Sequence, residues 1–348
     1  MTKKKTTDTD LGGEFKKRKA VGLLSGGLDS TLAHRVIVGE GYEVIAINYE
    51  TPFCNCGNNN TCTTARKNVK ENVEHRRFFA GPEYIEIVKK PKYGHGKHMN
   101  ICIDCRLYML KKAKEVMESE NADFVFTGEV LYQRPMSQRR DSLELIERES
   151  GLVGRLLRPL SAKKLRATIP EKEGMINRDR LYGFHGRNRT PQMNLAEKFG
   201  IEKYPSPAGG CLLTDEHYSR LLKDAFDHGE DSMIVLQLMK HGRHYRMEDG
   251  TRMVCGRTEK ENNTLRSMCD ESTGVVTVKG AKSAYVFIWG TVSGDNRECA
   301  GKIAARYSKE KDRDSVDIKW WIGRNGESKY KTFTVSTESD EYINRFKI

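Results

Sequence analysis

The feature that most constrains the fold is a strand–loop–helix–strand pattern near the start of the chain. Residues 20–24 form a short apolar run without a helical period, and Ser25-Gly26-Gly27-Leu28-Asp29-Ser30 follows it directly. Apolar residues then recur at helical spacing through about Val38, and a second apolar run covers residues 42–49. Two buried strands joined by one helix predict a parallel pair with a crossover helix.

The alternation of strands and helices continues downstream. The sequence predicts four further elements: a helix over 64–80, an extended segment over 83–89, a strong helix over 107–120 and a short strand over 122–126. Such alternation predicts an α/β doubly wound domain, in which ligands bind at the carboxyl ends of the strands. Ser25–Ser30 and Thr127-Gly128-Glu129 both follow strands, so we expect Gly128 to lie beside the same ligand. An ordinary strand end is the alternative for the second segment.

The hexapeptide from Ser25 to Ser30 is suited to holding phosphate. Gly26 and Gly27 allow a tight turn with exposed N–H groups, and the next helix adds its positive N-terminal end. The serine hydroxyls can donate hydrogen bonds, and Asp29 can hold Mg²⁺ or cap the helix. The segment is not a Walker A motif, because no Lys-Ser/Thr pair follows at the required spacing. The alternative is a plain turn with an Asp or Ser cap.

Composition favours a polyanionic partner and a reducing compartment. The 348 residues carry a formal net charge of +12, and five basic residues with no acid lie between Gly151 and Pro170. These are Arg155, Arg158, Lys163, Lys164 and Arg166. No apolar run reaches the roughly 18 residues that a membrane-spanning helix needs, and the polar start offers no signal peptide. We therefore expect a cytoplasmic protein without a membrane partner.

The nine cysteines indicate thiol or metal chemistry rather than a disulfide framework. Cys102 and Cys105 form a C-x-x-C pair that precedes the expected helix, where the helix dipole favours thiolates. Cys211 follows a glycine-rich turn. Cys54, Cys56 and Cys62 form a second group, for which a zinc site and bystander thiols are equally good interpretations.

The SGGxDS-like loop at Ser25–Ser30 resembles the signature of PP-loop ATP pyrophosphatases, which cleave ATP between its α and β phosphates. With the cysteines added, residues 20–250 resemble a PP-loop tRNA thiouridine synthetase, related to the 2-thiouridine and 4-thiouridine enzymes. The resemblance implies catalytic roles for Cys105 and Cys211. In cluster-dependent relatives, three cysteines hold a [4Fe–4S] cluster, and Cys102, Cys105 and Cys211 match that pattern. The residues after about 270 resemble the RNA-binding domain of NFACT proteins.

The resemblance implies an ATP-dependent enzyme that adenylates a uridine carbonyl oxygen of tRNA and replaces it with sulfur. ATP, Mg²⁺ and either a cluster or a persulfide would take part, with a cysteine desulfurase or sulfide as donor. We expect four regions: a basic tail (1–18), a PP-loop domain (19–185), a central region with the second catalytic cysteine (186–270) and a small β-rich RNA-binding domain (271–348). A nitrogen-transferring PP-loop ligase and a non-catalytic RNA-binding protein are the alternatives, and the oligomeric state stays open.

Two further segments have two interpretations each. Residues 132–140 include Gln133, Arg134, Gln138, Arg139 and Arg140, and either bind phosphate or RNA or form a solvated basic loop. Tyr285, Phe287 and Trp289 lie on one face of an expected strand. They either stack on bases or, in the interpretation that we favour, pack in a core.

Overall fold

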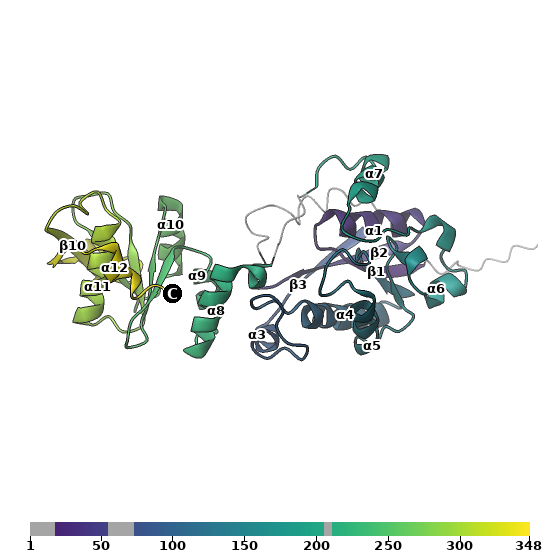
Figure 1. Cartoon of the computed structure of the whole chain (residues 1–348), viewed down its shortest axis with the longest axis horizontal. Coiled ribbons are helices and arrows are strands. Elements are labelled where there is room, and N and C mark those ends of the chain that lie inside the picture. Colours follow the sequence, from purple (N-terminus) through teal and green to yellow (C-terminus); the bar gives the residue numbers. More distant parts are fainter. Residues whose placement is uncertain (1–17, 55–72, 205–210) are drawn as a thin grey trace, which may run out of the picture. The chain divides into compact units, whose positions relative to one another are not determined.

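The computed structural model describes residues 18–54, 73–204 and 211–348, which form two compact units (Figure 1). Among the described residues, the first unit holds 18–51, 73–96 and 101–204, and the second holds 52–54, 97–100 and 211–348. Two short segments from the N-terminal half of the chain therefore belong to the second unit.

The first unit is built on a parallel sheet. Its strands are β1 (Lys19–Leu23), β2 (Glu43–Glu50), β3 (Val73–Phe79), β4 (Phe124–Phe126) and β5 (Leu156–Leu157), in the order β3-β2-β1-β4-β5. All four strand pairs are parallel, with Ala20 opposite Val44 and Phe124. The central place of β1 puts the loop that follows it in the middle of the sheet edge. The expected α/β parallel-sheet domain is confirmed.

Helices cover both faces of this sheet. They are α1 (Leu28–Gly39), α3 (Pro82–Lys89), α4 (Cys102–Ser119), α5 (Arg140–Glu149), α6 (Ile169–Lys172) and α7 (Thr190–Lys198). Neighbouring residues of β1 point to opposite faces, because strand side chains alternate. Ala20 packs with the α1 and α7 side, whereas Val21 packs with the α4 and α5 side. Figure 1 shows α1 on one side of the strands and α4 and α5 on the other.

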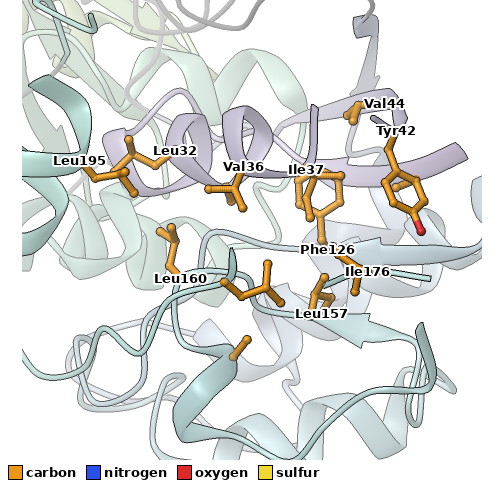
Figure 2. Packing of buried hydrophobic residues seen from close by; sticks show 14 of the residues in the cluster. Leu32, Val36, Ile37, Tyr42, Val44, Phe126, Leu157, Leu160, Ile176 and Leu195 are labelled. Atoms are coloured by element: carbon orange, nitrogen blue, oxygen red, sulfur yellow. The ribbon is translucent and has the colours of Figure 1, made fainter. Parts of the chain in front are cut away.

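The core on the α1 side fixes the helix that carries the loop. Figure 2 shows Leu32, Val36 and Ile37 of α1 directed at the side chains of Phe126, Leu157 and Leu160. Leu195 of α7 packs at one end of the cluster. Fully burying each such side chain contributes about 1.5–3 kcal/mol, so α1 is firmly seated against the sheet.

Two local expectations are wrong. The segment 73–79, expected within a helix, is strand β3, and residues 64–72 lie outside the described part of the chain. Residues 83–89, expected to be extended, belong to helix α3. Among the described strands, β3 pairs with β2 alone, and its side chains are half exposed. It therefore lacks an apolar run. Pro82 at the first turn of α3, with Tyr84, Ile85 and Val88 buried, is the helical signal.

The second unit contains an antiparallel sheet. Its strands are β6 (Arg243–Arg246), β7 (Arg252–Cys255), β8 (Gly274–Val278), β9 (Val286–Trp289), β10 (Ser315–Ile322) and β11 (Lys331–Ser336), in the order β11-β10-β8-β9-β7-β6. The helices are α8 (Glu216–Asp227), α9 (Met233–Leu238), α10 (Glu259–Met268), α11 (Gly294–Arg306) and α12 (Asp340–Asn344). The sheet thus begins at Arg243, ahead of the expected boundary at 271, since β6 and β7 complete it.

Each face of the second sheet is covered. Ala300, Ile303 and Ala304 of α11 pack on one face, and Leu238 of α9 and Leu265 of α10 pack on the other. Phe287 is fully buried on the α10 side, and Tyr285 and Trp289 pack partly buried beside it. Phe287 is thus a core residue, as we expected, whereas Tyr285 and Trp289 pack against that core and stay only partly buried. Within the described residues, no helix is long and apolar enough to cross a membrane.

Candidate functional site

The Ser25–Ser30 loop closes β1 onto α1 with a glycine turn. Gly26 has φ +83°, a left-handed value that suits glycine, and Gly27 is the N-cap of α1. Asn48 of β2 donates its Nδ2 hydrogen bond to the Leu24 carbonyl at 2.8 Å and so fixes the end of β1. Gly27 has no side chain, so no N-cap side chain accepts hydrogen bonds from the first-turn N–H groups. The first-turn N–H groups therefore suit an external anion.

The two serines have different tasks. Ser30 is buried and donates its hydroxyl to the Gly27 carbonyl at 2.9 Å, as Thr31 does at 3.1 Å. These bonds hold the turn. Ser25 is exposed, and its hydroxyl donates to the Ser30 hydroxyl at 3.2 Å. Ser25 is thus the hydroxyl that a phosphate can reach.

Asp29 is held by a chain of amides that the sequence analysis did not connect. Gln133 donates its Nε2 hydrogen bond to Asp29 Oδ2 at 2.8 Å, and Gln192 of α7 donates to Gln133 Oε1 at 3.2 Å. Burial raises the pKa of Asp29, against the lowering effect of Gln133, Arg189 and Arg134. Among the described residues, Asp29 Oδ1 is buried without a hydrogen-bond donor. A buried carboxylate oxygen of this kind suits a hard cation such as Mg²⁺.

Gly128 lies directly against the backbone of the loop. A Cβ at this position would lie 2.5 Å from the Asp29 carbonyl carbon and 2.5 Å from the Ser30 nitrogen. Gly128 therefore lets the end of β4 support the start of α1. This contact explains a glycine at this position without a direct contact to nucleotide.

Behind Gly128 lies a buried ion network. Glu129 Oε2 accepts from Arg158 Nε at 3.1 Å, and Glu129 Oε1 lies 3.5 Å from Arg106 Nε. Arg158 also pairs with Glu147 at 3.1 Å and donates to the Leu143 carbonyl. Arg158 is therefore internal, and only the other four residues of the expected basic stretch remain for RNA.

The C-x-x-C pair lies within the first turn of α4 rather than before the helix. Cys102 is the first residue of α4, and Cys105 donates its backbone N–H to the Ile101 carbonyl at 2.8 Å. Residues three apart share a helix face, so the two half-buried thiols are neighbours. Asp104 accepts from the backbone N–H groups of Lys92 and Tyr93 at 2.9 and 3.2 Å and fixes the turn in front of them.

Arg106 supplies positive charge to this turn. Burial lowers the pKa of Arg106, but the Glu129 carboxylate and the Cys105 and Cys102 thiols raise it more, so that its pKa lies above the usual value. The guanidinium thus connects the Glu129 network to the thiol pair.

Cys211 belongs to the second unit, where it is exposed and stands opposite Cys54 in an isolated antiparallel bridge. Leu212 N donates to the Phe53 carbonyl at 3.0 Å, so Cys54 and Cys211 are the non-hydrogen-bonded pair of that bridge. Cys56 and Cys62 lie outside the described residues. Among the residues that are described, no three His, Cys, Asp or Glu side chains are grouped to hold a metal ion.

Two family models match the chain. Residues 15–167 match the model described as thiamine biosynthesis protein (ThiI), and residues 242–347 match the RNA-binding domain of NFACT proteins. The two matched regions are thus similar to a ThiI-family PP-loop domain and to an NFACT-type RNA-binding domain. The ThiI-family match supports the use of ATP in tRNA modification, and the NFACT match supports RNA binding. Both recognitions made from the sequence are confirmed.

Three solved structures show distant likeness. The C-terminal part of the fibronectin/fibrinogen-binding protein of Streptococcus suis is 15% identical, with a TM-score of 0.27, over 76% of this chain and 98% of that one. NMN synthetase of Francisella tularensis is 14% identical, with a TM-score of 0.32, over 65% and 87%. The U34-tRNA thiolase NcsA of Methanococcus maripaludis, with its [4Fe–4S] cluster, is 16% identical, with a TM-score of 0.31, over 66% and 74%.

Proposed function

We propose that this ThiI-family chain is an ATP-dependent tRNA sulfurtransferase that adenylates a uridine carbonyl oxygen and replaces it with sulfur. The observation that carries the proposal lies within the first unit. The phosphate-type loop begins α1, and the C-x-x-C pair begins α4. In a parallel sheet with crossover helices, helices begin at the carboxyl edge of the strands. The proposed ATP site and the two thiols of α4 would thus lie at one edge of the sheet.

Activation of the base is the task of the loop. The N–H groups of the first turn of α1 and the Ser25 hydroxyl would bind ATP phosphates, and the Asp29 carboxylate with its orphaned Oδ1 would hold Mg²⁺. The uridine carbonyl oxygen attacks the α phosphate, and pyrophosphate leaves. The oxygen becomes part of an AMP leaving group, which departs far more readily than an oxide.

Delivery of sulfur falls to Cys102, Cys105 and Cys211. In one route, Cys211 carries a persulfide whose outer sulfur attacks the activated carbon, and Cys105 resolves the adduct as a disulfide. In the other, the three thiolates would hold a [4Fe–4S] cluster, which would supply sulfide. Cys102 and Cys105, one helical turn apart beside Arg106, fit two ligands of such a group. A cysteine desulfurase, which passes on sulfur already at the persulfide level, would be the donor in the first route, and sulfide would be the donor in the second.

Exposed cations on the first unit suit the RNA backbone. Lys163, Lys164 and Arg166 are exposed, and Arg140 Nη2 donates to the Lys164 carbonyl at 3.0 Å. This bond brings the start of α5 next to the basic stretch. Together with exposed Arg139, these side chains would contact phosphates and position the tRNA without reading its sequence.

Pyrophosphate release and thiouridine formation test the two halves of the reaction separately. With tRNA present, Asp29→Asn should lose both, because activation fails. Cys211→Ala should lose thiouridine and keep one round of pyrophosphate release. Cys299→Ala, a change at a buried cysteine of α11, is the matched control and should keep both. Two results for the wild-type protein would contradict the proposal: release of pyrophosphate when tRNA is left out, and release of pyrophosphate with tRNA but without thiouridine.

Protein prepared without oxygen distinguishes the sulfur routes. In the cluster route, iron and labile sulfide should copurify and give visible absorbance, and Cys102→Ser should remove both while ATP still binds. In the persulfide route, iron should be absent, and a protein-bound sulfane sulfur should map to Cys211 by peptide mass spectrometry. Neither signal with sulfur donor present would contradict the assigned cysteines.

A further inference from the structure

The second unit contains a cavity of about 820 Å³ beside α10. Its wall combines one face of α10 with the end of β8 and the loop before β9. Glu259, Asn262, Asn263 and Arg266 form the helical part, and their spacing is that of one helix face. A cavity of this volume is in the range of small-molecule sites, so it can enclose one or two nucleotides.

Positive charge dominates the wall. Glu259 is the acid among the lining residues. Five cations line the cavity: Arg243, Arg257, Arg266, Lys282 and Lys319. Glu327 neutralises part of this charge by pairing with Arg266 at 2.5 Å and Lys319 at 2.8 Å, and Glu261 lies 3.6 Å from Arg257. Within the described residues, no carboxylate pairs with Arg243 or Lys282. These two cations can pair with an anionic ligand at no cost in internal ion pairs.

Arg243 is held in place without a carboxylate. Its guanidinium lies over the Tyr307 ring, 4.3 Å from the centroid, and the Tyr307 hydroxyl accepts from Tyr245 at 3.3 Å. An arginine fixed by an aromatic ring keeps its fork of donors for a phosphate. Lys282 in the loop between β8 and β9 is exposed and adds a second, mobile donor.

Tyr285 adds an aromatic surface to the same wall. Its ring is partly exposed, and it packs 6.3 Å from Phe287 and 6.1 Å from Trp321 between ring centroids, which fixes it. Fixed aromatic rings next to cations are typical of sites for single-stranded RNA, where bases stack and phosphates meet Lys or Arg. A duplex keeps its bases stacked inside and is recognised on its outer surface.

We propose that this cavity binds one or two unpaired nucleotides of an RNA, with phosphate on Arg243 and Lys282 and a base against Tyr285. The inference rests on the proposed function only in taking RNA as the partner. It needs neither ATP nor the cysteines. The cavity then anchors an unpaired segment of the substrate while the first unit acts on the uridine.

Fluorescence anisotropy of the full chain with a labelled single-stranded oligoribonucleotide, without ATP, tests the cavity. The double variant Arg243→Ala/Lys282→Ala should weaken binding about tenfold or more. It should also lower the slope of log affinity against log salt by about 1.4, or 0.7 for each lost phosphate contact. Lys223→Ala/Lys311→Ala removes the same charge from exposed positions outside the cavity wall and should change both quantities little.

Two more variants protect the test against misfolding. Lys282→Glu changes one exposed side chain and should also weaken RNA binding. Tyr285→Phe keeps the ring and should bind RNA like the wild type. Tyr285→Leu removes the ring and should lower the affinity for RNA roughly fivefold or more. Equal losses in the cavity and control variants, or losses for duplex RNA alone, would overturn the proposal. Normal binding with absent thiouridine would instead overturn the proposed function and leave the cavity intact.

Discussion

Gly128 has no room for a side chain, because a Cβ would meet the Asp29 and Ser30 backbone at 2.5 Å. Gly128→Ala should therefore push the loop away from β4, cost about 1–3 kcal/mol of stability and weaken ATP binding. Isothermal titration with ATP and Mg²⁺, together with urea unfolding, measures both effects. Gly39→Ala is the control, since nothing lies within 4 Å of its Cβ and it ends α1. If Gly128→Ala bound ATP as tightly as the wild type, the Ser25–Ser30 loop would not be the ATP site.

His34 makes the stability of the first unit depend on pH. Burial on α1 lowers its pKa from 6.5 to about 4, and its Nδ1–H donates to the Ser30 carbonyl at 2.7 Å. As the pH falls, the unfolded chain binds this proton before the folded chain does. The contribution of neutral His34 to the free energy of unfolding is therefore complete above about pH 6.5, and it is lost progressively as the pH falls to about 4. The loss should total about 3 kcal/mol.

The His34→Gln variant isolates this effect from that of the other histidines. It should be less stable at pH 7, but its free energy of unfolding should fall less between pH 6.5 and 4 than that of the wild type. Hydrogen exchange of β1 and α1 amides across this range reports on the first unit. Parallel pH profiles for the two proteins would contradict the assignment.

At the scale of elements, the Cys54–Cys211 bridge makes a chemical prediction. A non-hydrogen-bonded antiparallel pair has Cα atoms about 4.5 Å apart, within the roughly 4.4–6.8 Å that a disulfide spans. A mild oxidant such as diamide should therefore join Cys54 to Cys211, as peptide mass spectrometry would show. Cys54→Ser should abolish that product. Cys255, whose pKa burial raises to about 12, should stay unreacted. Failure of Cys54 and Cys211 to join under diamide, in protein without ATP, tRNA or a sulfur donor, would refute this geometry.

Elements with a strong local signal could be predicted from the sequence. β1, the glycine loop and α1 carry an apolar run, a turn motif and a helical period in direct succession, and all three occur as expected. The segment of β3 was predicted as helix and that of α3 as strand. The reason is that β3 is a basic edge strand, which lacks the apolar run that marks a buried strand. The glycine–proline start of α3 was the available sign.

Partners distant in sequence could not be predicted. Gln192 supports Gln133 across 59 residues, and Cys54 stands opposite Cys211 although most of the sequence of the first unit lies between them. Neither Gln133 nor Gln192 stands in a recognisable motif, and their alignment depends on how α7 packs against α1. Arg158 was grouped with surface cations by composition, whereas its burial depends on Glu129 and Glu147.

At the scale of the whole molecule, the two kinds of domain were predicted, and the boundary was not. The change to β-branched and aromatic residues after about 270 marks β8 to β11 well. β6 and β7 precede it and contain arginines that are internal: Arg252 is fully buried and pairs with Asp224 and Glu230 at 2.8 Å. A strand whose charged side chains are paired inside a unit cannot be told from a surface segment by its sequence alone.

The central claim is that ATP activation and sulfur delivery meet at one uridine. Unmodified tRNA, ATP, Mg²⁺ and a ³⁴S-labelled donor, either sulfide or cysteine together with a cysteine desulfurase, are incubated with the anaerobically prepared chain. Nucleosides are then analysed by mass spectrometry alongside pyrophosphate. We expect labelled thiouridine in a one-to-one ratio with pyrophosphate, and none without ATP or with Cys211→Ala. If the wild-type chain released pyrophosphate together with an amino-substituted base, or with no modified nucleoside, the account would be contradicted.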